Sequence, residues 1–270
     1  MTLKIPGLVL ACIACVTQLP AQTLSSMTGA PPGRDTAAHR DSVVVRAFAS
    51  GALRAVATGG TSETNSADGS VGINLAWPRY SVNAVIGVSS SAKPLTRGFG
   101  ASLLNPASGT GLKSGLLDVL FRDRLNTFVG PLGLHLYVSA SSRLWSGSTD
   151  TTEGKDATVI GLGALLSRQI AVSSGDNRVA LGIDLGLSLR KISGDISDHD
   201  SLRTALLGSP REWFCGIEAG MATSVNKITA AIQLYYYWPR HVQGVGHWQM
   251  TTGVSVEAEL FSFRSLPENR

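Results

Sequence analysis

Apolar and polar residues alternate along most of the chain after Ser42, with the two-residue period that is typical of β-strands. In the clearest stretch, aliphatic side chains occupy every second position, and the residues between them are small or polar. The aliphatic positions are Val179, Leu181, Ile183, Leu185, Leu187 and Leu189, and the intervening ones are Ala180, Gly182, Asp184, Gly186, Ser188 and Arg190. Such a strand has one face suited to an apolar environment and one suited to a polar environment.

Ten segments follow this alternation, and most of them are long. They cover residues 43–57, 70–77, 79–90, 114–122, 133–145, 157–171, 178–191, 212–225, 227–238 and 247–263. Strands of soluble proteins average about 5–6 residues, whereas a tilted strand needs about 9–11 residues to cross a membrane. The pattern therefore predicts an all-β fold, an antiparallel up-and-down transmembrane β-barrel of about 10 strands, with between about 8 and 12 strands compatible with the sequence.

Long and short connections alternate between these segments. The long ones are 58–69, 91–113, 146–156, 192–211 and 239–246, and the short ones are residue 78, 123–132, 172–177 and residue 226. Membrane barrels of the bacterial outer membrane have short turns on the periplasmic side and longer loops outside. The alternation predicts that both chain ends and the short connections lie on one side, and the long connections on the other.

Aromatic residues fall near the ends of the predicted strands. We expect them to form girdles at the two membrane interfaces, where aromatic rings are enriched. The predicted girdle residues are Trp77, Tyr80, Trp145, Trp213, Trp238 and Trp248.

The first residues have the layout of a secretory signal peptide: Lys4, then an apolar stretch too short to span a membrane, then a small residue before the predicted cleavage site. An alternative interpretation takes Val9–Leu10–Ala11–Cys12 as a lipoprotein box with Cys12 lipidated. The predicted organisation is a signal peptide over 1–21, a flexible segment over 22–41, a barrel domain over 42–263 and a tail over 264–270.

Charge and cysteine content narrow the class of protein. The formal net charge is +4, and no run of Lys and Arg concentrates it, so we expect no nucleic-acid partner. Charged residues make up 16% of the chain, against about 25% in a typical soluble domain, which argues against a disordered chain. Removal of residues 1–21 leaves Cys215 as the one cysteine, so no intramolecular disulfide is expected. Cys215 alternates with Trp213 and Ile217 and is predicted on the apolar face.

On this pattern, residues 43–263 resemble bacterial outer-membrane β-barrel proteins. The last predicted strand ends in Leu260-Phe261-Ser262-Phe263, which is similar to the terminal aromatic signal that the assembly machinery of such proteins reads, although seven residues follow it here. The resemblance implies location in the outer membrane after export. It also implies contact with outer-membrane lipid, lipopolysaccharide and the assembly machinery.

If the aliphatic face meets lipid, the opposite face fills the interior of the barrel. Charges of both signs in such a narrow space are expected to pair, because a lone buried charge is costly. Small barrels are filled by side chains, and open channels need about 16 strands. The predicted lumen residues are Arg46, Arg54, Asn74, Asn83, Asp118, Arg122, His135, Tyr137, Arg143, Asp184, Arg190, Glu218, Gln233, Glu257 and Glu259.

Two groups of residues could carry chemistry. His135, Tyr137, Ser139 and Ser141 share one face of a strand, and a His–Ser pair can activate a hydroxyl. Asp195, Asp198, His199 and Asp200 share the connection 192–211, where they could bind a divalent cation or supply a general base. We interpret the first group as polar lumen residues and the second as a solvated loop.

The sequence has no phosphate-binding loop, dinucleotide fingerprint, CxxC pair or HExxH motif, so no enzymatic activity, cofactor or metal is predicted. The predicted role is structural, adhesive or small-solute transport with a largely filled lumen. Two alternatives remain: a soluble exported β-rich domain that binds a ligand, and an outer-membrane barrel hydrolase.

Overall fold

The computed structural model describes most of the predicted barrel domain. The described residues are 43–58, 61–91, 112–127, 130–145, 155–174, 177–207, 210–225, 227–238 and 249–265. The predicted signal peptide, the lipoprotein-box alternative and the flexible segment lie outside the described residues.

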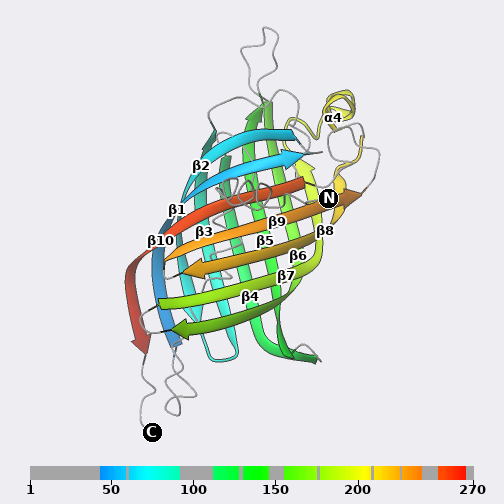
Figure 1. The fold of residues 1–270 in the computed structure, drawn as a ribbon. Helices are drawn as coiled ribbons and strands as arrows, with labels where there is room; N and C mark the ends of the chain where they lie inside the picture. Colours follow the sequence, from blue (N-terminus) through cyan, green and yellow to red (C-terminus); the bar gives the residue numbers. More distant parts are fainter. Residues whose placement is uncertain are drawn as a thin grey trace, which may run out of the picture.

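The described strands form one closed antiparallel barrel (Figure 1). Each strand pairs with the next along the chain, and β1 closes the ring against β10. The all-β, ten-strand, up-and-down prediction is therefore confirmed. The strands are β1 (Val43–Thr58), β2 (Thr61–Ala76), β3 (Tyr80–Ser91), β4 (Leu112–Thr127), β5 (Gly130–Trp145), β6 (Lys155–Ser174), β7 (Asn177–Ser193), β8 (Trp213–Val225), β9 (Ile228–Trp238) and β10 (Gln249–Ser265).

The outer and inner faces of the wall differ as the alternation predicts. On β7, Ile183, Leu185 and Leu187 point outward and are 49%, 57% and 64% exposed. Their neighbours Asp184 and Arg190 are buried inside the barrel. A two-residue period places the apolar side chains on one face of the wall and the polar ones on the other, because successive side chains of a strand point to opposite faces.

One β-bulge interrupts the closing seam between β1 and β10. Ala47 pairs with Phe261 and Phe48 pairs with Glu259, so Leu260 has no partner in the register. A bulge adds one residue to one strand and shifts the side on which the following side chains lie. As a result, Leu260, Phe261 and Phe263 are all exposed on the outer wall, although a strict alternation would divide them between the two faces.

The strands extend further than the sequence pattern indicated. The predicted connection 58–69 is wrong, because β2 begins at Thr61 and leaves only residues 59–60 between it and β1. Backbone pairing between the two strands continues up to the pair Thr58 and Thr61. Hydrogen bonds of the backbone do not require apolar side chains. The start of β2 is polar and shows no alternation, so the sequence pattern did not identify it as a strand.

Two of the four predicted short connections are shorter still. β4 and β5 leave only residues 128–129 between them, in place of 123–132, and β6 and β7 leave only 175–176, in place of 172–177. The connection between β7 and β8 contains the helix α4 (Asp200–Leu207), which lies at the end of the barrel opposite to the end of β10 (Figure 1).

Candidate functional site

The barrel interior contains a polar network centred on Arg190 of β7, whose side chain is 1% exposed. The guanidinium donates from Nη1 to Ser139 Oγ at 3.0 Å and from Nη2 to Tyr137 Oη at 2.8 Å. Nη2 also forms an ion pair of 2.5 Å with Glu218 Oε1. Tyr137 donates in turn to Glu218 Oε2 at 2.8 Å. These contacts join β5, β7 and β8 from the inside.

Two glycines of β6 make room for this network. β6 lies between β5 and β7, and Gly161 pairs in the register with Ser139 on one side and Arg190 on the other. A Cβ atom at Gly161 would overlap the guanidinium of Arg190, and one at Gly163 would overlap the ring of Tyr137. The two long side chains therefore pass over β6 only because it has no side chains at these positions.

A second polar chain runs through β2, β3, β4 and β5. Asn74 donates to Asn83 Oδ1, and Asn83 Nδ2 donates to Asp118 Oδ2 at 3.4 Å. His135 Nδ1 lies 3.1 Å from Asp118 Oδ1 and 3.3 Å from Asp118 Oδ2. Asp118 and His135 are buried, at 2% and 3% exposure. The carboxylate of Asp118 is thus held between the amide of Asn83 and the imidazole of His135.

A third group lies at the seam, where Arg46 of β1 forms ion pairs with Glu257 and Glu259 of β10. The Arg46 Nε to Glu259 Oε2 distance is 3.5 Å. The bulge at Leu260 follows directly after Glu259 and leaves both acids on the side of Arg46. The pairing joins the first and last strands of the barrel.

Asp184 differs from the other described inward carboxylates. It is 4% exposed, and its Oδ1 has no hydrogen-bond partner among the residues that the structure describes. Its carboxylate lies over Gly220 of β8, where a Cβ atom would overlap it. Its electrostatic neighbours are His135 and Glu218.

Part of the interior is apolar, which the sequence analysis did not predict. Phe48, Val85, Leu116 and Leu165 cluster with the ring of Tyr137. Tyr235 and Tyr237 of β9 are each 1% exposed, and their rings stack with centroids 6.2 Å apart. Gln233, Tyr235 and Tyr237 occupy alternate positions of β9, so the prediction that Gln233 faces the lumen could have been extended to both tyrosines. The interior is therefore packed by rings and aliphatic side chains as well as by ion pairs.

The structure brings some predicted lumen residues together and leaves others apart. Arg190 pairs with Glu218, Asp118 with His135, and Arg46 with Glu257 and Glu259. Arg122 is half-buried on β4, and its backbone N–H donates to Arg79 O at 2.8 Å. Arg54 and Arg143 lie on β1 and β5, but their side chains are outside the described part of the structure.

The described aromatic residues of the predicted girdles lie at or beside strand ends. Trp77 and Tyr80 flank the connection between β2 and β3, and their rings stack with centroids 4.6 Å apart. Trp213 begins β8 and Trp238 ends β9, with exposures of 50% and 43%. Trp145 is the last residue of β5, but its side chain is not described, and Trp248 lies outside the described residues.

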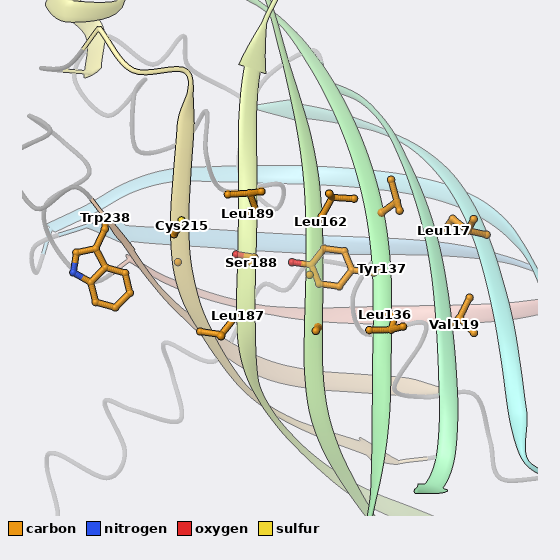
Figure 2. A pocket seen from close by; sticks show the side chains of 14 residues that line it. Leu117, Val119, Leu136, Tyr137, Leu162, Leu187, Ser188, Leu189, Cys215 and Trp238 are labelled. Carbon is orange, nitrogen blue, oxygen red and sulfur yellow. The ribbon is translucent and has the colours of Figure 1, made fainter.

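The outer wall carries an apolar furrow of about 660 Å³ across β4 to β9 (Figure 2). Its two edges are rows of outward side chains, and the backbone between the rows forms its floor, which includes Gly163 and Gly216. One row consists of Leu117, Val138, Leu162, Leu189, Cys215 and Trp238, and the other contains Val119, Leu136, Ala164 and Leu187. Cys215 is a free thiol and is exposed, on the apolar face where the sequence placed it.

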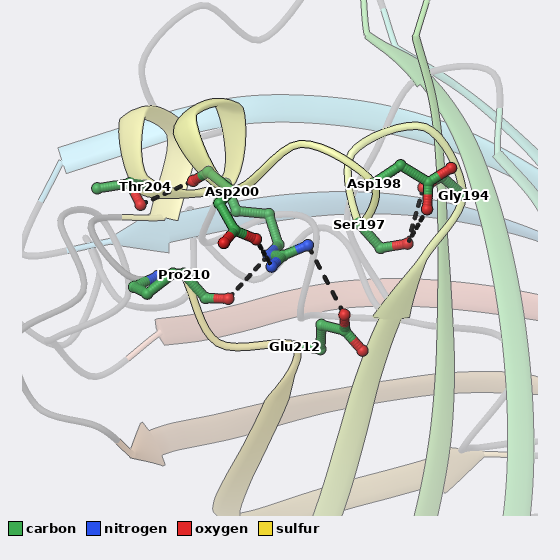
Figure 3. A network of polar contacts seen from close by, with 8 residues as sticks. Gly194, Ser197, Asp198, Asp200, Thr204, Pro210 and Glu212 are labelled. Atoms are coloured by element: carbon green, nitrogen blue, oxygen red, sulfur yellow. Dashed lines mark hydrogen bonds and ion pairs between the residues drawn. The ribbon is translucent and has the colours of Figure 1, made fainter.

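The connection between β7 and β8 is organised around Arg203 of α4 (Figure 3). Arg203 is 4% exposed, donates from Nε to Pro210 O at 2.9 Å, and forms ion pairs with Asp200 and with Glu212, the latter at 3.7 Å. Ile196, in the same connection, is fully buried. Arg203 and Ile196 are therefore packed into this connection, whereas the acidic residues and His199 beside them are exposed.

The two groups considered for chemistry do not assemble into a reactive site among the described residues. His135 contacts Asp118, whereas Ser139 accepts its hydrogen bond from Arg190. Asp195, Asp198 and His199 are exposed, and Asp200 pairs with Arg203. Within the described ranges, no cluster of three or more His, Cys, Asp or Glu side chains could hold a metal ion. No helix in the same ranges is long and apolar enough to cross a membrane.

Comparisons with known proteins give structural neighbours but no family. No protein-family model matches the sequence, and no curated protein matches it. The translocator domain of the autotransporter NalP from Neisseria meningitidis is 16% identical, with a TM-score of 0.33, and the match covers 87% of this chain and 94% of that one. The β domain of the Bordetella autotransporter BrkA is 11% identical, with a TM-score of 0.33 and coverage of 78% and 98%.

The outer-membrane protease OmpT from Escherichia coli is a further neighbour, 9% identical with a TM-score of 0.32, and the match covers 84% of this chain and 99% of that one. These neighbours are outer-membrane β-barrels. At such low identities and TM-scores they assign no activity to this chain, and its barrel architecture rests on the closed strand pairing itself.

Proposed function

We propose that this chain is a bacterial outer-membrane β-barrel with a structural or adhesive role, whose interior is closed by its own side chains. The location and the role both go beyond the barrel fold, and each has its own support.

The observation that carries the location is the inverted distribution of residues across the wall. Large aliphatic side chains are exposed on the outer face, with Ile86, Leu187 and Leu260 at 66%, 64% and 61%. Charged side chains are buried on the inner face, with Arg190 and Asp118 at 1% and 2%. A soluble protein rarely exposes a contiguous apolar surface of this extent, whereas the outer wall of a membrane barrel requires one.

The closed interior supports a structural or adhesive role over solute transport. The Arg190 network joins three strands, and the cluster of Phe48, Val85, Leu116 and Leu165 adds apolar packing. A barrel of about this size has an interior just wide enough for side chains to fill. The ordered unit around α4 then offers a surface for contact at the end with the longer connections.

The outer wall supports the proposed partners. Its exposed aliphatic side chains suit contact with outer-membrane lipid and lipopolysaccharide. Phe261 and Phe263 at the end of β10 are exposed on this wall, at 57% and 62%, and are accessible to the assembly machinery.

Fractionation of cells that express the full chain tests the location. We expect the protein in the outer-membrane fraction, resistant to carbonate and high salt, and with a gel mobility that changes on boiling because a closed barrel stays folded in cold detergent. Recovery in the soluble periplasmic fraction would contradict the proposal and favour the soluble exported domain.

A further inference from the structure

We propose that the chain ahead of β1 adds a strand to the open edge of β10 and so completes the barrel wall below the start of β9. The added strand comprises residues 22–30, which lie outside the described residues, and the open edge comprises residues 258–265. The inference rests on the proposed membrane location and adds to it a strand-addition site within the chain.

The open edge exists because β10 continues past the start of β9 (Figure 1). β10 pairs with β1 as far as Ser265, whereas its pairing with β9 ends at Val256, opposite the first residue of β9. One further backbone hydrogen bond joins Glu257 N to Lys227 O at 3.1 Å. Within the described part of the chain, residues 258–265 have no strand on the side that faces away from β1.

The side chains along the open edge are exposed on both faces of the wall. On the outer face, Leu260, Phe261 and Phe263 are exposed by 61%, 57% and 62%. On the inner face, Ser262 is exposed as well, although Ser255 of the same strand is buried. The wall therefore loses its lateral cover at the point where β9 is absent, while its outer side chains remain apolar.

Much of the open edge lies within the proposed membrane layer. Trp77 of the predicted girdle follows directly after Ala76, and the register row of Ala76 runs through Val44 of β1 to Arg264 of β10. Residues 258–263 lie on the side of this row that faces the middle of the wall. Backbone N–H and C=O groups find no water in hydrocarbon, and open sheet edges do not occur there. This edge therefore needs a strand to pair with it.

The chain ahead of β1 starts beside this edge. Val43, the first residue of β1, pairs with Ser265 at the end of β10. The connections at the same end of the barrel are residues 77–79, 128–129, 175–176 and 226–227, and each is too short to supply a strand. The other connections between strands leave from the opposite end of the barrel. Position alone thus favours the segment that leads into β1.

The composition of residues 22–30 suits an edge in a membrane wall. Their sequence is QTLSSMTGA, which contains no charged side chain. In extended form they span about 30 Å, and residues 258–265 span about 26 Å, so the two match in length. Pro31 and Pro32 follow, and proline ends a paired strand because it has no backbone N–H.

Residues 33–42 suit the connection from the added strand to β1. They carry Arg34, Asp35, Arg40 and Asp41, which favour an aqueous position below the wall. If the added strand runs parallel to β10, it ends beside the start of β1, two strand spacings or about 10 Å away. The connection can reach about 33 Å when extended, which is ample for that crossing.

Photo-cross-linking tests this assignment. The full chain carries p-benzoylphenylalanine in place of Phe261, is folded into vesicles and is irradiated, and mass spectrometry identifies the cross-linked peptides. An equal mixture of unlabelled and nitrogen-15-labelled chains separates links within one chain from links between two copies. The control carries the same probe in place of Leu185, which pairs in the register with Leu166 and Ala219, so both edges of β7 are covered there.

We expect the probe at position 261 to link to residues 22–30 of the same chain, and the probe at position 185 not to link to them. Ser25→Pro with Thr28→Pro removes two backbone N–H groups from the added strand and should abolish the link. Thr36→Pro with Ala38→Pro places the same change in the connection and should preserve it.

The alternative partners of the edge give different results. Links from position 261 to lipid alone, to a second copy or to residues 266–270 would overturn the assignment of residues 22–30 while leaving the membrane location intact. Recovery of the chain in the supernatant after the vesicles are sedimented would instead contradict the membrane location.

A second measurement needs no probe in the wall. In urea unfolding from vesicles, followed by gel mobility without boiling, Ser25→Pro with Thr28→Pro should unfold at a lower urea concentration than Thr36→Pro with Ala38→Pro. The reason is that the first pair of substitutions uncovers the edge of β10 and the second does not. Equal midpoints for the two double variants would overturn the added strand.

Discussion

Arg190 and Glu218 form an ion pair of 2.5 Å inside the barrel, and Tyr137 bonds to both partners. Arg190 pairs in the register with Phe214 and not with Glu218, so the contact runs diagonally along the inner wall between β7 and β8. The pair is therefore a tertiary contact that fixes how side chains fill the lumen, in addition to the backbone ladder.

Removing one partner of this pair should destabilise the barrel strongly. Glu218→Leu leaves the guanidinium of Arg190 buried without its carboxylate, which typically costs about 3–5 kcal/mol. The double variant Arg190→Leu with Glu218→Leu removes both charges, so we expect it to be less destabilised than the sum of the two single variants. Urea unfolding from vesicles, followed by gel mobility without boiling, measures all four proteins. Strict additivity would mean that the two charges do not depend on each other.

Gly161→Ala should damage the same network by steric overlap. The new Cβ atom would displace the Arg190 guanidinium from Ser139, and overpacking of this kind typically costs about 1–3 kcal/mol. Gly69→Ala on β2 is the matched control, because among the described residues no atom beyond its chain neighbours lies within 4 Å of the Cβ position there. The same unfolding assay should rank Gly161→Ala well below Gly69→Ala in stability. Equal stability would show that β6 has spare room above Gly161.

Leu185→Arg should be poorly tolerated in a membrane. Leu185 lies in the middle of β7 and is 57% exposed on the outer wall, where an arginine near the bilayer midplane costs about 2–4 kcal/mol. Thr204→Arg places the same side chain at an exposed position of α4 and should have little effect. The yield of folded protein in vesicles distinguishes the two. Normal folding of Leu185→Arg would contradict the assignment of this face to lipid.

Arg203→Gln should loosen the connection between β7 and β8 without unfolding the barrel. The substitution removes the ion pairs with Asp200 and Glu212, and it weakens the contact with Pro210 O. Arg211 is exposed nearby, so limited trypsin digestion after this residue should become faster. Thr204→Ala, which removes one exposed hydroxyl from the same helix, is the control. Unchanged cleavage of Arg203→Gln would mean that Arg203 does not hold the connection.

The alternation of side chains predicted the barrel because it is a local property. On β7, the order of Leu185, Leu187 and Leu189 against Asp184 and Arg190 states directly which face is outside. The alternation could not locate the bulge at Leu260, because an unpaired residue depends on the partner strand. It also hid the start of β2, where backbone pairing with β1 continues through polar residues.

The sequence predicted that charged side chains would pair inside the lumen, but it did not predict which residues would pair. The presence of both charge signs indicated that ion pairs would form, but the partners depend on the stagger of the strands around the barrel. This stagger brings Asp118 to His135 and leaves Asp184 over Gly220. In the apolar cluster, Val85 and Leu116 are register partners on the neighbouring strands β3 and β4, whereas Phe48 lies on β1, which is not their neighbour. No local pattern reveals a contact between strands that are not neighbours.

The conductance of planar bilayers tests the closed lumen most directly. The full-length chain is reconstituted into planar bilayers, and its folding is verified in the same sample by the change of gel mobility on boiling. We expect no ion conductance above that of the bare bilayer, because Arg190, Glu218 and Tyr137 occupy the interior together with the apolar cluster. The triple variant Phe48→Ala, Leu116→Ala and Arg190→Ala, if it inserts, should conduct. A steady conductance of the unmodified chain that equals that of the triple variant would contradict the closed interior.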